Sequence, residues 1–240
     1  MPAISTAKIK QIKSLSLKKF RDELGLFTVE GEKCVEEALA SSFDVVEVWR
    51  RDEIGEKAME RMSALSSPSP ILAVVRKPLP MAADVPSGGL FLGLDGIRDP
   101  GNLGTIIRTA AWFGIERIYA SPDTVDVFNP KVVQASMGAI FRVPVIYCDL
   151  PRFCGSISEA GGRIYGTFLD GEDIFRKDLG CESPASLILI GNESEGISAQ
   201  CSALVTDRIT IPSFSQNPPE SLNASVAAAV TLAEFRRRLQ

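Results

Sequence analysis

From residue 90 onward, short apolar runs alternate with helical patterns, and this alternation constrains the fold more than any other feature of the chain. The apolar runs cover 90–94, 117–121, 143–147, 163–168, 187–190 and 208–211. Helical patterns lie between several of these runs, at 103–113, 130–139, 152–160 and 221–239. Such an order is typical of a parallel sheet covered by helices on both faces. Ligands of these sheets bind beside the carboxyl ends of the strands, so the loops there are the first candidates for a site.

The residues before 90 predict a second, smaller α/β domain. We expect helices at 6–24, 32–41 and 53–65 and strands at 26–31, 45–49 and 71–78. The stretch "KPLPMAADVPSGG" (77–89) then combines three prolines and two glycines, which indicates a linker. With a boundary near residue 85, the predicted domains are 1–85 and 86–240.

The chain of 240 residues contains no histidine, and this absence excludes several kinds of active site. A Ser-His-Asp or Cys-His hydrolase and a His-ligated metal site are ruled out. The five cysteines lie far apart without a C-x-x-C pair, which favours reduced thiols over zinc ligands or disulfides. We therefore expect no metal site, and proton transfer by groups other than imidazole.

The first 21 residues carry six Lys or Arg side chains and no acid, although the whole chain has a net charge of −4. Three more arginines, Arg236 to Arg238, lie near the other end. Solvated helix faces are the simplest interpretation of both groups, and RNA contact is the alternative. No apolar run approaches the ~18 residues of a membrane span. The first residues also lack the apolar core of a secretory signal, so we expect a cytoplasmic protein without membrane contact.

The first unusual loop, "LDGIRDPGNLGTIIRTAAWFG" (94–114), leads into a helix. Asp99 and Pro100 have the residue types of an N-cap and a first helical position. The expected buried stripe of this helix is Ile106, Ala110 and Phe113. Arg108 lies about 200° round the helix from the start of that stripe and points away from it. An ordinary surface arginine is the alternative to a functional one.

The second loop, "GNESEGIS" (191–198), has the glycine spacing of a phosphate-binding P-loop but not its chemistry. Ile197 stands where a P-loop has lysine, and Glu193 and Glu195 would repel a polyphosphate. What remains is a close backbone approach through glycine and a carboxylate that accepts from donors or steadies a cation. A tight turn with two exposed acids is the alternative.

The third loop and its helix, "ITIPSFSQNPPESLNASVAAAVTLAEFRRRL", cover 209–239. Ser221 is the predicted N-cap, and Asn223 is expected in the first helical turn, where free N–H groups favour polar ligands. The small residues of "ASVAAAV" allow close packing against another element or a second subunit.

Three segments match a known family in order and spacing. "DGIRDPGNLGTIIRTAAWFG", "LILIGNESEGIS" and "IPSFSQNPPESLNASVAAAVTLAEFRRR" resemble the signature motifs of the SpoU-type (TrmH-like) RNA 2′-O-ribose methyltransferases. The resemblance covers residues 90–239. Residues 5–78, with "FTVEGEKCVEEAL" and "PILAVVRKP", look like the L30e-like substrate-binding domain that often precedes it.

The resemblance implies an α/β trefoil-knot domain with a parallel sheet, preceded by a small L30e-like α/β domain. It also implies S-adenosylmethionine as cofactor, rRNA or tRNA as substrate, methyl transfer to a ribose 2′-hydroxyl, and a homodimer formed through the C-terminal domain. The positions that match the family's catalytic motif residues are Asn102, Arg108, Glu193, Ser221 and Asn223. Those expected at the cofactor are Gly191, Gly196, Ile211 and Leu222.

The resemblance also suggests a role for each polar residue. In the family the arginine matching Arg108 has been proposed as the base. Because arginine is permanently protonated, we expect Arg108 instead to bind the RNA phosphate and polarise the hydroxyl, with the proton leaving to phosphate or water. Asn102 and Asn223 would position the loop and the ribose. Glu193 would orient Arg108 or another donor, and Ser221 would hold the knot loop. With the family in view, we expect the N-terminal lysines to contact RNA.

The sequence departs from the family pattern in three places, and two other functions remain open. Ser194 stands where a glycine is frequent, Ser213 replaces a frequent methionine, and the loop 213–220 is about two residues longer. One alternative is an RNA-binding protein of the same fold without catalytic activity. The other is a methyltransferase that acts on a base or a small molecule.

Overall fold

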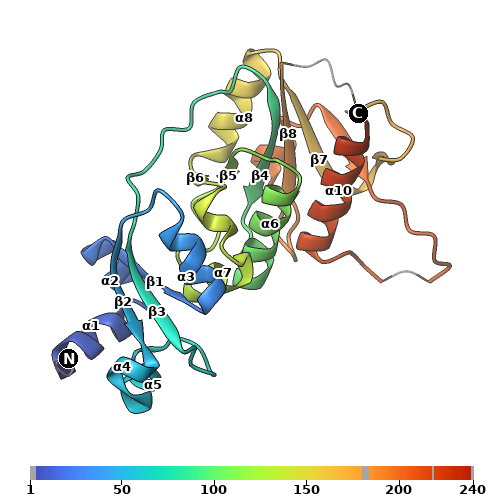
Figure 1. Cartoon of the computed structure of the whole chain (residues 1–240). Coiled ribbons are helices and arrows are strands. Elements are labelled where there is room, and N and C mark those ends of the chain that lie inside the picture. Colours follow the sequence, from blue (N-terminus) through green and yellow to red (C-terminus); the bar gives the residue numbers. More distant parts are fainter. Residues whose placement is uncertain (1–3, 180–183, 218, 239–240) are drawn as a thin grey trace.

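The computed structural model describes residues 4–179, 184–217 and 219–238, which form two α/β units joined by an extended segment (Figure 1). We call residues 4–76 the N-terminal unit and residues 89–238 the C-terminal unit. The N-terminal unit consists of α1 (Thr6–Ser14), α2 (Lys18–Leu24), β1 (Leu26–Glu30), α3 (Glu32–Leu39), β2 (Val45–Arg50), α4 (Arg51–Ile54), α5 (Glu56–Met62) and β3 (Ile71–Arg76). Its strands form an antiparallel sheet in the order β1-β3-β2.

The central strand β3 is buried on both faces of this sheet. Ala73 and Val75 belong to the large core that includes α3 and continues into the C-terminal unit. Leu72 and Val74 pack with side chains of α1 and α5 on the other face. Since successive side chains of a strand point to opposite faces, one apolar strand can serve both helix layers.

The prediction of a single helix over 6–24 is wrong, because the chain forms α1 and α2 with a break between them. The guanidinium of Arg21 fills this break, and its Nη1 donates to the carbonyl oxygens of Leu15 and Ser16 at 2.9 Å each. Its Nε and Nη2 donate to Asp126 of the C-terminal unit at 3.0 and 2.6 Å. The break between α1 and α2 therefore depends on Asp126, which is 105 positions away from Arg21. Local helix propensity carries no information about so distant a partner.

The C-terminal unit is built around a parallel sheet. Its elements are β4 (Gly89–Asp95), α6 (Pro100–Trp112), β5 (Ile118–Ala120), α7 (Pro130–Ser136), the short 3₁₀ helix η1 (Ala139–Phe141), β6 (Val145–Tyr147), α8 (Leu150–Glu159), β7 (Arg163–Asp173), β8 (Ala185–Gly191), α9 (Ala199–Ser202), β9 (Asp207–Thr210) and α10 (Ala224–Arg238). The strand order is β6-β5-β4-β8-β7-β9, with every neighbouring pair parallel. The predicted parallel α/β sheet is thus confirmed.

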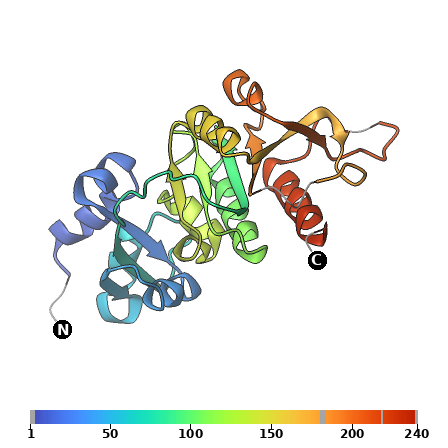
Figure 2. The same cartoon turned by 90° about the horizontal axis from the view of Figure 1, so that it is seen from above.

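Helices cover both faces of this sheet, as predicted. Side chains of α6, α7 and α10 share one core, whereas those of α8 and α9 share another. Figure 2 shows the two groups of helices on opposite sides of the sheet. The loops of interest follow the carboxyl ends of the strands.

The two units are packed against each other rather than merely linked in sequence. The rings of Phe27 in β1 and Phe128 before α7 lie 4.6 Å apart between centroids. Glu37 of α3 forms an ion pair with Arg142, which follows η1. Together with the ion pair between the buried Arg21 and the partly buried Asp126, these contacts hold α3 and its sheet against the C-terminal unit.

Candidate active site

The site lies where β4, β8 and β9 end. The pairing of β4 with β8 places Asp95 opposite Gly191, so the two strands end side by side. From β4 the chain continues to β5 on one side, whereas β8 leads to strands on the other side. Such a reversal of strand order at the carboxyl ends is the usual place for a ligand in an open parallel sheet.

The loop after β4 positions the start of α6 as the sequence predicts. The side chain of Asp99 accepts a hydrogen bond from the Asn102 N–H at 2.8 Å, and Pro100 occupies the first helical position. Ile106 is fully buried, and Arg108 on the opposite side of the helix is exposed. The helix therefore presents Asn102 at its buried N-terminal end and Arg108 at its outer face.

The loop after β8 closes on itself through glycine. The Asn192 N–H donates to the Gly196 carbonyl at 2.9 Å, and the Gly196 N–H donates back to Asn192 at 3.0 Å. A Cβ on Gly191 would lie 2.3 Å from backbone atoms of Gly196 and Ile197. Gly196 has a φ of 70°, in the left-handed region. Each glycine is thus required, the first for space and the second for backbone conformation.

Asn192 organises the same loop, although the sequence analysis did not single it out. Its Oδ1 accepts from the N–H groups of Ser194 and Glu195 at 2.9 and 3.0 Å, and its Nδ2 donates to the Gly96 carbonyl at 2.6 Å. An Asn that opens a Gly-bounded loop is the available signal for such an Asx turn. Met137 is the one non-glycine residue with positive φ in the described ranges, so Ser194 has ordinary backbone geometry. A side chain at 194 therefore costs the loop nothing in backbone strain.

Three of the predicted polar residues meet in one hydrogen-bonded cluster. Asn102 Nδ2 donates to Glu193 Oε1 at 2.8 Å, and Asn223 Nδ2 donates to Asn102 Oδ1 at 2.9 Å. The second oxygen of Glu193 accepts a long bond of 3.5 Å from the Arg98 N–H. The three loops are therefore joined through the amide of Asn102, which uses both its donor and its acceptor.

The third loop differs from its prediction at the helix start. The N-cap of α10 is Asn223, whose Oδ1 accepts from the Ser225 N–H at 2.9 Å, and the prediction of Ser221 as N-cap is wrong. Asparagine caps the helix with its oxygen while its separate nitrogen donates to Asn102, whereas serine has one short hydroxyl for both. Ser221 is exposed, Leu222 is half-exposed, and Ile211 is partly buried against the core.

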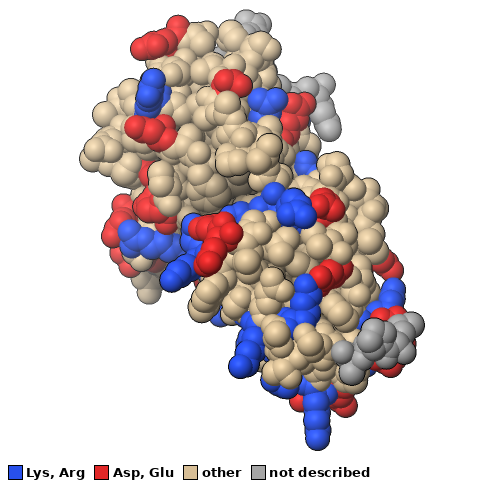
Figure 3. All heavy atoms as spheres, turned by 90° about the vertical axis from the view of Figure 1, so that its left-hand side faces the viewer, with Lys and Arg blue, Asp and Glu red and all other residues tan. Residues whose placement is uncertain are grey.

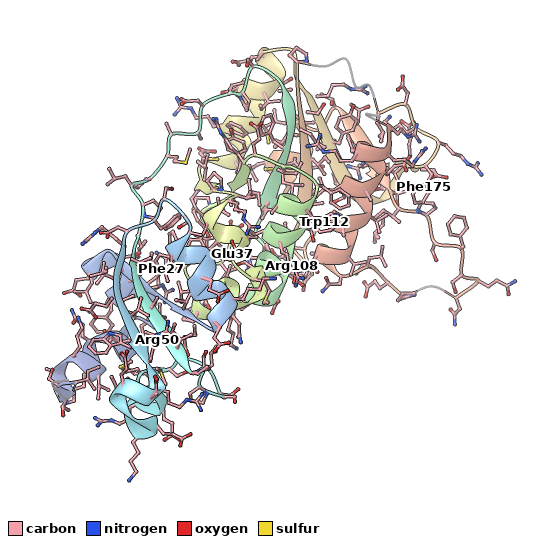
Figure 4. The ribbon with its side chains drawn as sticks, viewed as in Figure 1. Phe27, Glu37, Arg50, Arg108, Trp112 and Phe175 are labelled. Carbon is pink, nitrogen blue, oxygen red and sulfur yellow. The ribbon has the colours of Figure 1, made fainter. Side chains whose placement is uncertain are left out.

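Arg108 stands apart from this cluster. None of the hydrogen bonds or ion pairs among the described residues involves its side chain, and Glu193 is bound to Asn102 and Arg98 instead. Six residues along a helix correspond to a rise of ~9 Å, which separates Arg108 from Asn102. In Figure 4, Arg108 lies beside Trp112, one turn further along the outer face of α6. The sequence leaves two partners open for Glu193, namely Arg108 or another donor. Within this single chain, Glu193 accepts from another donor, the side-chain amide of Asn102.

The described part of the chain contains no group of Cys, Asp and Glu side chains arranged to hold a metal ion. In the same residues, no helix is both long and apolar enough to cross a membrane.

Comparison with known proteins gives one consistent result. The family model described as "SpoU rRNA Methylase family" matches residues 89–233, and the "MRM3-like substrate binding domain" matches residues 6–79. The chain is 32% identical over 244 residues to the 23S rRNA (guanosine(2553)-2′-O)-methyltransferase RlmP of Bacillus subtilis, covering 95% of this chain and 96% of that protein.

Solved structures agree over nearly the full length. A putative RNA methyltransferase of the TrmH family from Porphyromonas gingivalis superposes with a TM-score of 0.86 at 35% identity, covering 99% of this chain and 100% of that one. The AdoMet-bound rRNA methyltransferase from Sinorhizobium meliloti gives a TM-score of 0.88 at 28% identity, covering 100% and 98%. Because the family model spans the unit that carries the three loops, the chain belongs to the SpoU rRNA Methylase family.

Proposed function

We propose that this chain transfers a methyl group from S-adenosylmethionine to a ribose 2′-hydroxyl of ribosomal RNA. S-adenosylmethionine-dependent RNA methylation is the activity of the family to which it belongs, and an AdoMet-bound relative matches its whole length. The observation that carries the proposal is the cluster of Asn102, Glu193 and Asn223, which joins all three motif loops at the ends of the strands. The domain assignment belongs to the proposal too, with substrate binding in 1–85 and methyl transfer in 86–240.

The residues at the strand ends suit this cofactor. Ile211 and Leu222 offer apolar side chains, and the loop 191–196 offers backbone groups, as a neutral adenosine requires. The acids Glu193 and Glu195 favour a cation over a polyphosphate. S-adenosylmethionine supplies a methyl group on a positively charged sulfur. In the proposal, the chain ties its last segment into a trefoil knot around these loops.

Arg108 acts on the RNA rather than on the cofactor. Its guanidinium is permanently charged and has no partner among the described residues, so its five N–H donors are available for a phosphate. Bound there, it would hold the ribose and polarise the 2′-hydroxyl, whose proton leaves to phosphate or water. Asn102 and Asn223 position the loop and the ribose, and Glu193 fixes the amide of Asn102.

The proposed partner of the outer face of α6 is a second copy of the chain. Trp112 on α6 is 85% exposed, and Val226 on the neighbouring helix α10 is 47% exposed. Large exposed apolar side chains on adjacent helices are unusual for a monomer. A homodimer through these helices would bring Arg108 of one protomer to the site of the other. Light scattering of the Trp112→Glu variant tests this, and an unchanged mass would refute it.

The N-terminal unit is proposed to contact the RNA, through fewer lysines than the sequence indicates. Figure 3 shows Lys and Arg side chains gathered over the lower part of the molecule, where this unit lies. Lys8 is neutralised by Glu47, whereas Lys10 and Arg61 line a groove of about 400 Å³ together with the ring of Phe20. Cations beside an aromatic ring in a groove suit a single-stranded segment of RNA. A cytoplasmic location goes with this substrate.

The test is transfer of labelled methyl to ribosomal RNA isolated from a strain that lacks the protein. Arg108→Ala should abolish transfer and leave S-adenosylmethionine binding unchanged by calorimetry. Arg152→Ala, which removes an exposed arginine from α8 on the opposite face of the sheet, is the control and should retain activity. Transfer to RNA with a 2′-deoxy target nucleotide would favour a base methyltransferase instead. Absence of cofactor binding would favour the RNA-binding protein without catalysis.

A further inference from the structure

A surface pocket of about 570 Å³ lies at one end of the N-terminal unit, where β2 leads into α4 and β3 begins. It is lined by Glu32, Arg50, Arg51, Asp52 and Glu56 beside the apolar Ile71. Its volume falls in the range of small-molecule sites and is sufficient for one nucleotide. No residue of the three motif loops contributes to this lining, so it is distinct from the methyl-transfer site.

The charges of the lining select the class of ligand. Three carboxylates, from Glu32, Asp52 and Glu56, outnumber the two guanidinium groups. Arg51 forms an ion pair with Glu56 at 3.8 Å, which leaves Arg50 beside Glu32 and Asp52, a mixed set of charges that suits neither a phosphate nor a simple cation. A neutral group that carries both donors and acceptors can satisfy both kinds of side chain. Nucleobases are the groups of RNA with this property.

The polar side chains of the pocket have unused hydrogen-bonding capacity. Those of Glu32, Arg50 and Asp52 form no hydrogen bond or ion pair with any residue that the structure describes. Arg51 donates from Nη2 to the Pro68 carbonyl at 3.2 Å, but its Nε is buried without an acceptor. A ligand in this pocket can therefore supply an acceptor to the Nε of Arg51.

The position of the pocket connects it to the substrate of the methyl-transfer site. β2 runs toward the lower side of Figure 1 and ends at Arg50, and β4 also runs toward that side before it leads into the loop of Asn102. Figure 4 shows Arg50 and Arg108 on the N-terminal and C-terminal units respectively. A strand of RNA that lies along the lower side of the molecule can therefore reach both.

We propose that this pocket binds an unpaired guanine of the RNA substrate, outside the nucleotide that is methylated. Guanine presents O6 and N7 as acceptors, which match the parallel donors of Arg50. Its N1–H and 2-amino groups are donors, which match the carboxylates of Glu32 and Asp52. Sequence-specific recognition of RNA generally uses such unstacked bases. The inference rests on the proposed RNA substrate and names a determinant of its sequence specificity.

The experiment measures binding of nonamer oligouridylates that carry one central base, by fluorescence anisotropy with the full-length protein. Saturating S-adenosylhomocysteine keeps the bases out of the cofactor site. The guanine oligomer should bind about 10-fold more tightly than the adenine oligomer, because one bidentate arginine contact discriminates to that degree. Hypoxanthine, which lacks the 2-amino group, and 7-deazaguanine, which lacks N7, should each lose part of this advantage.

Two variants distinguish base recognition from charge. Arg50→Met should abolish the preference for guanine over 7-deazaguanine and raise KM for RNA without changing kcat. Arg76→Met removes an exposed arginine from the opposite end of the same sheet and should preserve the preference. Equal affinity for all four oligomers, or equal weakening of all four by Arg50→Met, would overturn the inference. The binding readouts need no methyl transfer, so an inactive wild-type protein would refute the proposed function without touching the preference for guanine.

Discussion

Replacement of Gly191 by alanine tests the geometry of the loop that carries Glu193 of the hydrogen-bonded cluster and lies at the proposed cofactor site. An added Cβ would lie 2.3 Å from Gly196 C and from Ile197 N, and 2.6 Å from the Gly196 carbonyl oxygen. All three are backbone atoms, so no side-chain rotation relieves the clash. Ordinary contacts begin near 3.4 Å, and the two strands of the loop must therefore separate by about 1 Å.

The cost follows from the contacts that this separation breaks. The two hydrogen bonds between Asn192 and Gly196 contribute about 0.5–1.5 kcal/mol each. Overpacking of a tight site adds about 1–3 kcal/mol. The free energy of unfolding should then fall by about 2–6 kcal/mol, a large part of the 5–15 kcal/mol typical of a domain. If the loop opens instead, stability falls less, but Glu193 moves away from Asn102 and cofactor affinity is lost.

Urea denaturation and calorimetric titration with S-adenosylmethionine measure both outcomes. Gly155→Ala is the matched control, because Gly155 lies inside α8 and a Cβ there meets nothing within 4 Å. It should stabilise the protein by about 0.5–1 kcal/mol through helix propensity. A Gly191→Ala protein with normal stability and normal cofactor affinity would refute the close-approach argument.

Three further variants test other parts of the structure. Arg21→Met leaves the partly buried Asp126 without its cation and should lower the free energy of unfolding by about 3 kcal/mol in urea, while wild-type stability would show the pair to be dispensable. Asn223→Ser keeps an N-cap for α10 but removes the amide donor to α6, so the melting temperature should hold while methyl transfer falls. Hydrogen bonding from Arg237 lowers the pKa of Glu234 from 4.5 to about 2, so its stabilising effect is complete above pH 4.5 and is lost as the pH falls toward 2. Glu234→Gln should flatten the dependence of melting temperature on pH in that range, and an unchanged slope would refute the assignment.

The alternation of strands and helices in the C-terminal unit could be predicted from the sequence because it reflects local apolar patterns. Contacts between segments that are distant in the sequence could not be predicted in this way. The arginines of the last helix, interpreted from sequence as a solvated face, include Arg236, which donates to the carbonyls of Phe113 and Gly114 at 2.6 and 2.8 Å. These carbonyls lie just past the end of α6, so Arg236 completes a helix terminus more than 120 positions earlier.

The polar residues of the site were identified by their motif, but their partners were not. Glu193 was expected to orient Arg108 or another donor, and the donor that it meets is the amide of Asn102, 91 positions away. Ser221 has the residue type of an N-cap, yet Asn223 takes that place because its amide can also reach Asn102. Spacing along the chain shows which residues belong to a loop, whereas the fold alone decides which loops meet.

The cluster of Asn102, Glu193 and Asn223 is built mainly from neutral amides, whereas the cation Arg108 lies outside it. Asn102 uses its donor on Glu193 and its acceptor on Asn223, so its orientation is fixed before any ligand binds. A frame of amides and backbone groups needs no counter-ion and brings only one carboxylate, which suits a cofactor with a positive charge. The cation of α6, Arg108, is left outside this frame and exposed, where an RNA phosphate can reach it. We therefore expect the loops to bind the cofactor and Arg108 to bind the substrate, so Arg108→Ala should impair methyl transfer but not cofactor binding.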